Sequence, residues 1–146
     1  MNIQIRTISE NDYPVLLSLF QEMADFEKLP DRMINSVEQM QNEKEFIKGF
    51  VATNENEEIL GYATCFFAYY TWVGKSLYLD DLYVRKDFRG NGIGTMLIKQ
   101  IIQLAKSENC KRLRWQVSAW NEPAIAFYKS LGATVDPTES NCDLLF

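Results

Sequence analysis

The chain contains no histidine, and this absence narrows the chemistry that its 146 residues can perform. Any general base must be a carboxylate, a tyrosine, a neutral amine or a relayed water, and Ser-His and Cys-His nucleophilic arrangements are excluded. The three cysteines, Cys65, Cys110 and Cys142, are odd in number and widely spaced. This spacing favours reduced thiols over a disulfide framework or a zinc site, so we expect no metal.

Long apolar runs and basic stripes are also missing. No run is long enough to span a bilayer, and residues 1–6 lack the charged-then-apolar pattern of a signal peptide. We therefore expect a cytoplasmic protein with no membrane partner. The net charge of −5 argues against nucleic-acid binding and suits a cationic small substrate. The length and the 47% hydrophobic content predict one folded domain, residues 1–146.

Apolar periodicity predicts a mixed α/β fold in which helices cover a central sheet. The expected strands are residues 3–8, 50–53, 59–70, 76–84 and 112–117, with one or two more in the tail 134–146. The expected helices run from about residue 11 to 23, from Ser36 to near Gly49, from 93 to about 109, and from 122 to 131.

A glycine-rich segment, Arg89-Gly-Asn-Gly-Ile-Gly94 followed by Thr95, joins an expected strand to an expected helix. Free backbone N–H groups at the positive end of a helix form a cradle for a phosphate or pyrophosphate. The spacing is not the G-x-G-x-x-G of a dinucleotide site, and the lysine of a P-loop is missing. An ordinary left-handed turn before a helix is the alternative interpretation.

A second helix start, Trp120-Asn-Glu-Pro-Ala124, follows the strand expected at 112–117. Asn121 is a good N-cap, and Pro123 is tolerated in the first turn because its missing N–H has no helical partner there. Taken alone, Asn121 and Tyr128 indicate only a well-capped amphipathic helix.

The combination is more informative than either part. A strand, an Arg-x-x-Gly-x-Gly loop, a helix, a strand and then Asn-x-x-Ala-x-x-Phe-Tyr resembles the GNAT N-acetyltransferases. Ala24–Pro30, Trp72–Lys75, Tyr78–Asp81 and Trp120–Pro123 extend the likeness to the diamine acetyltransferases, which comprise the spermidine/spermine and thialysine enzymes. The resemblance covers most of the chain from about Ala24 to Ala133.

The resemblance implies acetyl-CoA as cosubstrate, held by the loop amides, by Arg89 and by the backbone of the preceding strand. One N–H of that strand would stabilise the developing oxyanion. The residues implied to contact the coenzyme are Leu82, Tyr83, Val84, Arg89, Gly90, Asn91, Gly92, Ile93, Gly94, Thr95, Asn121 and Ala124.

The catalytic residues implied by the resemblance are Asp80, which would deprotonate the attacking amine through water, and Tyr128, which would protonate the departing thiolate. Asp81 lies beside Asp80, and because adjacent strand residues face opposite ways, we expect only one of them to point into the cleft. The alternative interpretation of both residues is that they are solvated or structural acids. The direct attack of the amine needs no cysteine.

The implied substrate residues are Glu27, which would hold a distal ammonium, with Phe26, Asp80 and Asp81 beside it. Asp25, Phe26, Trp72 and Trp115 are weaker candidates, and for these four core packing is at least as good an interpretation. The chain departs from the family where Asp80 replaces a glutamate, and near Asn141-Cys142, where relatives have a tryptophan. The altered tail bears on the identity of the acceptor.

We therefore expect N-acetylation of a small primary amine, either a polyamine, a diamine or a thialysine-like amino acid. The alternatives are another amine, such as an amino acid, an aminoglycoside or a protein N-terminus, and a non-catalytic acetyl-CoA-binding protein. The resemblance also implies a homodimer.

Overall fold

The computed structural model describes residues 1–138 and 140–146. The chain forms two compact units, Met1–Trp115 and Gln116–Phe146. We describe each unit by itself.

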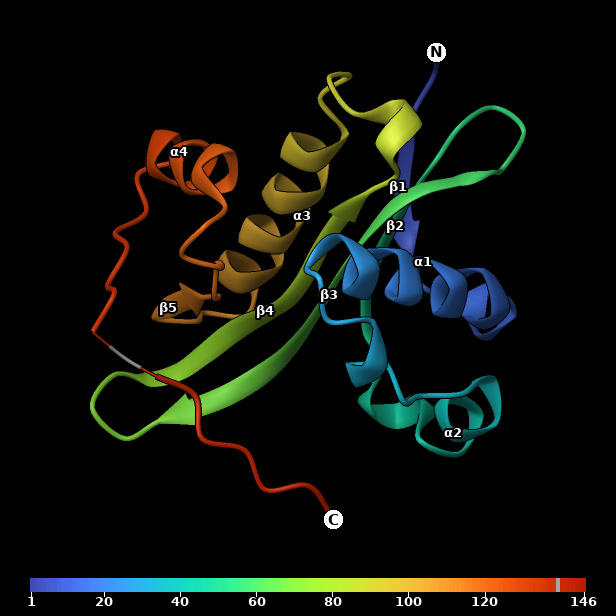
Figure 1. Cartoon of the computed structure of the whole chain (residues 1–146). Helices are drawn as coiled ribbons and strands as arrows, with labels where there is room; N and C mark the ends of the chain where they lie inside the picture. The colour runs from blue at the N-terminus through green and yellow to red at the C-terminus, as the bar shows by residue number, and fades with distance from the viewer. Residues whose placement is uncertain (139) are drawn as a thin grey trace. The chain divides into compact units, whose positions relative to one another are not determined.

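The first unit is built on a five-stranded sheet in the order β1-β2-β3-β4-β5 (Figure 1). All neighbours are antiparallel except β4 and β5, which run parallel. The strands are β1 (Gln4–Thr7), β2 (Lys48–Thr53), β3 (Ile59–Tyr70), β4 (Gly74–Val84) and β5 (Arg112–Arg114). The α/β mixed sheet predicted from the periodicity is confirmed.

α1 (Tyr13–Phe26) and α3 (Ile93–Ser107) pack on the sheet because each presents a continuous apolar stripe to it, whereas the short α2 (Val37–Asn42) packs on α1. Leu16 and Leu19 of α1 pack with Tyr62 and Tyr83 of the sheet in one buried cluster. The apolar stripe of α3 is buried along its length, at Ile93, Leu97, Ile98 and Ile101. The side chains of Tyr62 and Tyr83 thus mark the α1 face of the sheet.

The second predicted helix is shorter than expected. It ends at Asn42, a 3₁₀ turn follows at Lys44–Phe46, and β2 already begins at Lys48. Gly49 therefore lies inside a strand rather than at a helix end. The physical reason is a close approach, because a Cβ at Gly49 would clash with the backbone carbonyl oxygen of Ala63 on β3.

The second unit contains α4 (Glu122–Ser130), which is followed by Gly132 at a φ of 91°. The Asn121 side chain caps this helix by accepting a hydrogen bond from the Ala124 amide at 3.3 Å. The strands expected within 134–146 are wrong for the described residues of that tail, where no backbone ladder forms. A strand requires a paired neighbour, and the strand predicted at 112–117 is likewise paired only over Arg112–Arg114.

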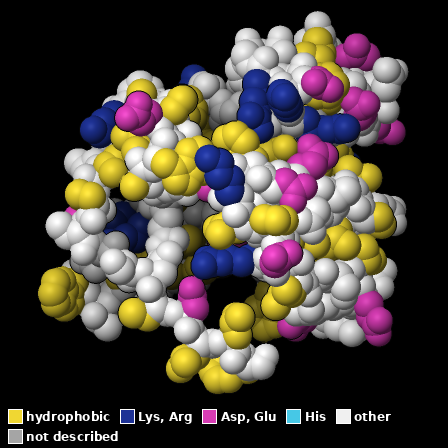
Figure 2. All heavy atoms as spheres, viewed as in Figure 1, with side chains coloured by type: hydrophobic (Ala, Val, Ile, Leu, Met, Phe, Trp, Pro, Cys, Tyr) yellow, Lys and Arg dark blue, Asp and Glu magenta, His cyan; other side chains and the backbone are white. Residues whose placement is uncertain are grey.

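Among the described residues, no helix has the length and apolarity to cross a membrane. The space-filling view shows Lys and Arg side chains next to acidic ones on the displayed face (Figure 2).

Candidate active site

The loop between β4 and α3 has the geometry of an anion cradle. A 3₁₀ turn, Lys86–Phe88, follows β4, and α3 begins at Ile93 after Gly92, which serves as its N-cap. Gly90 and Gly92 have φ values of 84° and 77°, in the left-handed region that glycine adopts without a Cβ penalty. The loop therefore requires glycine at both positions for its backbone conformation.

The backbone amides of this loop are available to a ligand. The first backbone hydrogen bond into α3 is from the Met96 N–H to the Gly92 carbonyl, at 3.0 Å. For residues 90–95, no acceptor of their N–H groups is found among the described residues. Orphan donors at the positive end of a helix attract phosphate oxygens. This stretch could hold the pyrophosphate of a coenzyme.

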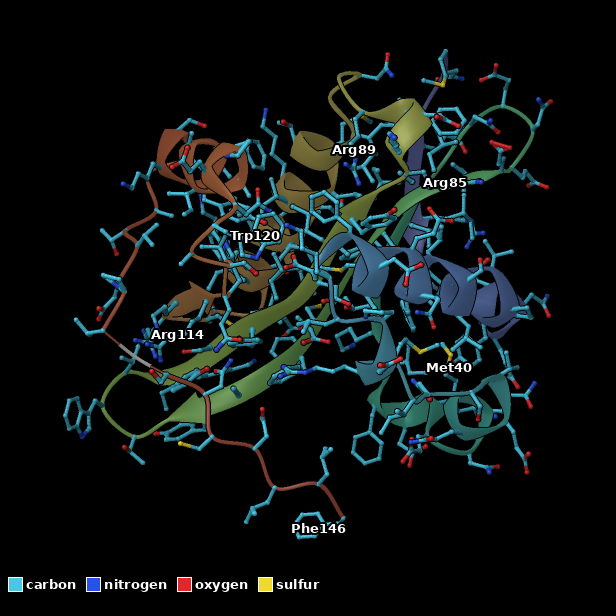
Figure 3. All side chains as sticks on the ribbon, in the orientation of Figure 1. Met40, Arg85, Arg89, Arg114, Trp120 and Phe146 are labelled. Carbon is cyan, nitrogen blue, oxygen red and sulfur yellow. The ribbon has the colours of Figure 1, made fainter. Side chains whose placement is uncertain are left out.

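Arg89 links the loop to the end of β4 through a hydrogen bond. Its Nε donates a hydrogen bond of 2.8 Å to the Val84 carbonyl, and its guanidinium lies 4.9 Å from the ring centroid of Phe26 and 5.4 Å from that of Tyr83. Asn91 closes the turn by donating to the Phe88 carbonyl at 2.9 Å. Arg89 is thus held at the end of β4, where Figure 3 shows it beside the start of the loop.

The edge of β4 that leads to the loop is open on one side. β5 pairs with β4 only at Ser76, Leu77 and Tyr78, whereas Leu82–Val84 pair only with β3 in the described structure. Backbone groups on the other side of Leu82–Val84 can therefore bind an extended ligand as a further strand would. The predicted pantetheine contacts of Leu82, Tyr83 and Val84 fit this edge and stay predictions.

A pocket of about 690 Å³ lies on the α1 face of the sheet. Its walls come from the C-terminal half of α1, the segment 29–35 and the region 40–48, and its floor comes from β3 and β4. Three acidic side chains line it, Glu27, Asp80 and Asp81, together with two basic ones, Arg32 and Lys48. The apolar lining includes Phe20, Met23, Phe46 and Phe66.

Asp80 and Asp81 both line this pocket, so the expectation that only one of them would do so is wrong. The reason is a β-bulge: Thr64 pairs with Asp81 and Cys65 with Leu79, which leaves Asp80 as an extra residue on β4. A bulge interrupts the alternation of side chains along its strand. Two adjacent carboxyl groups thereby point to the same face.

The electrostatics of the pair set it apart from ordinary surface acids. Burial raises the pKa of Asp80. Burial, and then repulsion from Asp80, raises the pKa of Asp81 to about 6, with a further contribution from Glu27. The buried Tyr62 hydroxyl opposes this by donating a hydrogen bond to Asp81 Oδ2 at 3.2 Å. A carboxyl with such a pKa can accept a proton near neutral pH.

Of the other residues predicted to bind the substrate, only some line this pocket. Glu27 lines the pocket, but Phe26 is not among its lining residues and lies under Arg89 instead. Trp72 is 99% exposed at the β3–β4 turn, and Asp25 accepts a hydrogen bond from Gln21 on α1. Trp115 is half-buried and does not line the pocket either.

Asn121 and Tyr128 belong to the second unit. The Asn121 side chain caps α4, and the Tyr128 ring lies 5.5 Å from the Phe127 ring, centroid to centroid. The backbone amide of Ala124 donates the hydrogen bond that the Asn121 side chain accepts. Their proposed contacts with the coenzyme and the thiolate stay predictions.

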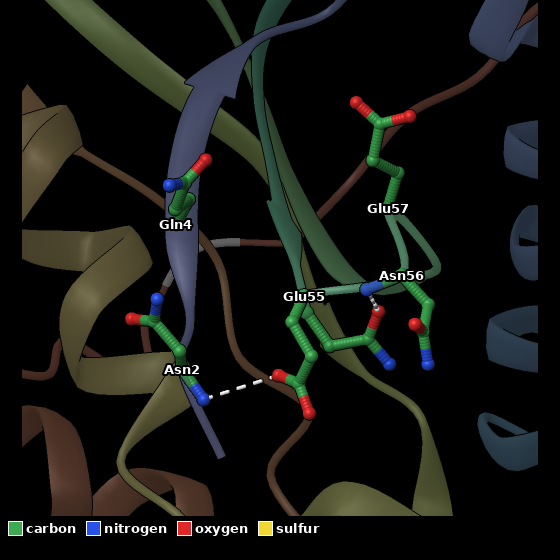
Figure 4. A pocket seen from close by; sticks show the side chains of 6 residues that line it. Asn2, Gln4, Glu55, Asn56 and Glu57 are labelled. Carbon is green, nitrogen blue, oxygen red and sulfur yellow. Dashed lines mark hydrogen bonds between the residues drawn. The ribbon is translucent and has the colours of Figure 1, made fainter.

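A second hollow, of about 350 Å³, lies between the N-terminal residues and the β2–β3 turn (Figure 4). Its lining is entirely polar, and its interactions are local: the Asn2 amide donates to Glu55 Oε2 at 3.2 Å. Within the turn, the Asn54 side chain accepts from the amides of Asn56 and Glu58. These contacts build a solvated turn and offer no apolar wall for a substrate.

Sequence reasoning missed Tyr62 as the partner of Asp81, and it missed Arg32 and Lys48 as residues that line the pocket. Tyr62 reads as an ordinary core residue of an alternating strand, and no local signal marks its hydroxyl as the partner of Asp81. In the described residues, no cluster of three or more His, Cys, Asp or Glu side chains could hold a metal ion.

A mixed sheet with a glycine-rich anion loop and a pocket lined by three carboxyl groups suits an enzyme that transfers a group from an anionic cosubstrate. Residues 9–133 match the family described as "Acetyltransferase (GNAT) family". The chain belongs to this family and is an N-acetyltransferase of the GNAT type.

Individual relatives agree with this assignment. The chain is 36% identical to the thialysine N-epsilon-acetyltransferase of Bos taurus over 149 residues, which cover 94% of this chain and 87% of the relative. It is 31% identical to the human spermidine/spermine N(1)-acetyltransferase-like protein 1 over 140 residues, covering 89% of this chain and 20% of that protein. These relatives confirm the predicted similarity to the diamine acetyltransferases.

A solved structure confirms the fold. The integron cassette protein from V. cholerae superposes with a TM-score of 0.79 at 26% identity, over 100% of this chain and 94% of the other.

Proposed function

We propose that this enzyme transfers the acetyl group of acetyl-CoA to the primary amine of a small diamine, polyamine or thialysine-like amino acid. The observation that carries the proposal is the bulge that directs Asp80 and Asp81 into one pocket on the strand that leads to the anion loop. A pocket with acidic side chains and an aromatic lining suits an alkylammonium group.

The proposed mechanism is direct attack in a ternary complex. The amides of residues 90–95 bind the pyrophosphate, with Arg89 near it, and the edge of Leu82–Val84 binds the pantetheine arm. The amine nitrogen first forms a bond to the acetyl carbonyl carbon, and the carbon–sulfur bond then breaks. An N–H of the β4 edge stabilises the oxyanion that forms between these events.

Three proton transfers complete the proposed reaction. An ammonium loses its proton to the Asp80–Asp81 pair, directly or through a water, before it attacks. Asp81 is the better base near neutral pH because its pKa is raised to about 6. Tyr128 then donates a proton to the thiolate of coenzyme A, and its phenolate takes up the second proton that the acetylated nitrogen loses. Asn121 and Ala124 contact the coenzyme.

We also propose that residues 1–146 act as one domain and that the enzyme is a cytoplasmic homodimer acting on dissolved amines, without a metal, nucleic acid or membrane partner. The homodimer follows from the resemblance to the diamine acetyltransferases. Sedimentation of the purified protein tests the dimer, and unchanged turnover after treatment with EDTA is expected.

Thiol release from acetyl-CoA tests the function. The purified enzyme is assayed with putrescine, spermidine, thialysine, lysine and an aminoglycoside, and acetylated products are identified by mass spectrometry. We expect turnover with at least one of the first four amines. Tight coenzyme binding without turnover of any amine would reject the enzymatic proposal in favour of a binding protein.

A further inference from the structure

The guanidinium of Arg89 lies against two aromatic rings on the α1 face of the sheet. Its central carbon is 4.9 Å from the ring centroid of Phe26, the last residue of α1, and 5.4 Å from that of Tyr83 on β4. Its Nε atom is bonded to the Val84 carbonyl. Stacking on rings restricts a guanidinium without using its hydrogen-bond donors, so the Nη groups stay available to an anion.

The Tyr83 ring is itself fixed through its hydroxyl. Tyr83 is only 7% exposed, and its hydroxyl donates a hydrogen bond of 3.0 Å to Glu22 Oε1 on α1. Glu22 and Phe26 lie one helical turn apart, and side chains with this spacing share a face of the helix. The same face of α1 therefore carries the carboxylate that holds Tyr83 and the ring that contacts Arg89.

Two opposite charges thus flank Tyr83 without pairing with each other. The ion pairs among the described residues include neither Arg89 nor Glu22. Burial, and next the hydrogen bond to Glu22, raises the pKa of Tyr83, whereas the nearby Arg89 acts in the opposite direction. The neutral hydroxyl therefore interacts with both charged groups and takes the place of a direct ion pair.

The absence of this ion pair matters for the coenzyme loop. A carboxylate binds a guanidinium through the same donors that a phosphate uses, so Glu22 would compete with a pyrophosphate for Arg89. A guanidinium that is already restricted also loses less side-chain entropy when it binds an anion. Both effects favour coenzyme binding.

We propose that Tyr83 is a positioning residue for Arg89: its ring supports the guanidinium, and its hydroxyl binds Glu22, which would otherwise pair with the guanidinium and withdraw it from the coenzyme. This inference rests on the proposed coenzyme site. It adds a role for the side chains of Tyr83 and Glu22 to the backbone contacts proposed for the β4 edge.

The other arginine that follows β4 is held elsewhere. Arg85 Nη1 donates to the Ile59 carbonyl at 3.4 Å, and its guanidinium lies 6.0 Å from the Phe88 ring centroid. The contacts with Phe26 and Tyr83 are thus specific to Arg89, which is the residue at the start of the glycine-rich segment.

Calorimetry with coenzyme A and the kinetics of thiol release test the proposal. Tyr83→Phe keeps the ring and frees Glu22, so the Kd for coenzyme A and the KM for acetyl-CoA should rise about three- to tenfold. The kcat and the KM for the amine should change little. Glu22→Gln removes the competing charge but keeps an acceptor for the hydroxyl, and its affinity should match the wild type.

Rescue in the double variant is the decisive measurement. Tyr83→Phe combined with Glu22→Gln should recover most of the lost affinity, because the charge that draws Arg89 away is gone. A hydroxyl that only stabilises the packing would not be replaced by the loss of a carboxylate. In an Arg89→Gln background, Tyr83→Phe should have no further effect on coenzyme affinity.

Two controls separate this role from a general effect on the fold. Tyr13→Phe removes the hydroxyl of another tyrosine in the same buried cluster and should keep the wild-type affinity. S-acetylpantetheine lacks the pyrophosphate, so kcat/KM with this donor should be equal in the wild type and in Tyr83→Phe.

Three results would overturn the positioning role: unchanged affinity in Tyr83→Phe, a loss that Glu22→Gln does not reverse, or a loss that persists without Arg89. A wild-type enzyme that does not bind coenzyme A would reject the proposed function and this inference together. Coenzyme binding that depends on Tyr83 as expected, without acetylation of any amine, would reject the proposed acetyl transfer alone.

Discussion

Asp81→Asn should make the protein more stable and less active at neutral pH. The Asp81 carboxyl lies beside Asp80 at the floor of the pocket, and its pKa is raised from 3.8 to about 6 by burial and by the charge of Asp80. Keeping this group ionised in the folded state therefore costs free energy. An amide of nearly the same shape removes the charge and can still accept the hydrogen bond from Tyr62.

The magnitude follows from the pKa difference. A shift of one unit corresponds to 1.36 kcal/mol, so a rise of about two units destabilises the folded state by up to about 3 kcal/mol. The folded protein binds the proton more tightly than the unfolded chain between pH 4 and 6. Below about pH 4 the carboxyl is protonated in both states and the cost vanishes, whereas above about pH 6 the cost is complete.

Urea unfolding of the wild type and of Asp81→Asn at pH 4, 5, 6 and 7.5 measures this difference. We expect the variant to gain up to about 3 kcal/mol at pH 7.5 and almost nothing at pH 4, with kcat/KM reduced at least a hundredfold at pH 7.5. Asp143→Asn changes an exposed carboxyl of the tail and is the control. A gain that is absent at pH 7.5 or independent of pH would refute the reasoning.

Three further predictions concern Tyr62 beside the acid pair, the glycine loop and α4. Tyr62→Phe removes the hydrogen bond that lowers the pKa of Asp81, so the acidic limb of the kcat/KM profile should move up by about one pH unit. The control Tyr13→Phe should leave this limb in place. An unmoved limb in Tyr62→Phe would exclude Asp81 as the base. Gly92→Ala places a Cβ on a residue with a φ of 77° and should destabilise the protein by about 1–2 kcal/mol. The same variant should bind coenzyme A more weakly in calorimetry. Unchanged affinity would count against the loop as the pyrophosphate-binding site. Tyr128→Phe should lower kcat at least tenfold with little change in acetyl-CoA affinity, and full activity would remove Tyr128 as the acid.

The starts of α3 and α4 were predictable because their signals are local. The glycines at 90 and 92, the apolar period from Ile93 and the Asn121 cap each depend on a few neighbouring residues, and α3 and α4 begin where these signals place them. The same applies to β3, which spans Ile59–Tyr70 as predicted.

Boundaries that depend on distant partners were not predictable in this way. Gly49 reads as a helix end, yet it is the residue that lets β2 approach the Ala63 carbonyl on β3. The strands expected in the tail did not form in its described residues, because a strand exists only where a neighbour completes its hydrogen bonds.

The sequence by itself determined the class of chemistry: no histidine, a glycine loop between a strand and a helix, and carboxyl groups on the strand before it. Only the tertiary structure decided where those carboxyl groups point, because the bulge opposite Thr64 and Cys65 turns Asp80 and Asp81 to one face. Strand register is a long-range property, and it cannot be read from the order of residues along one strand.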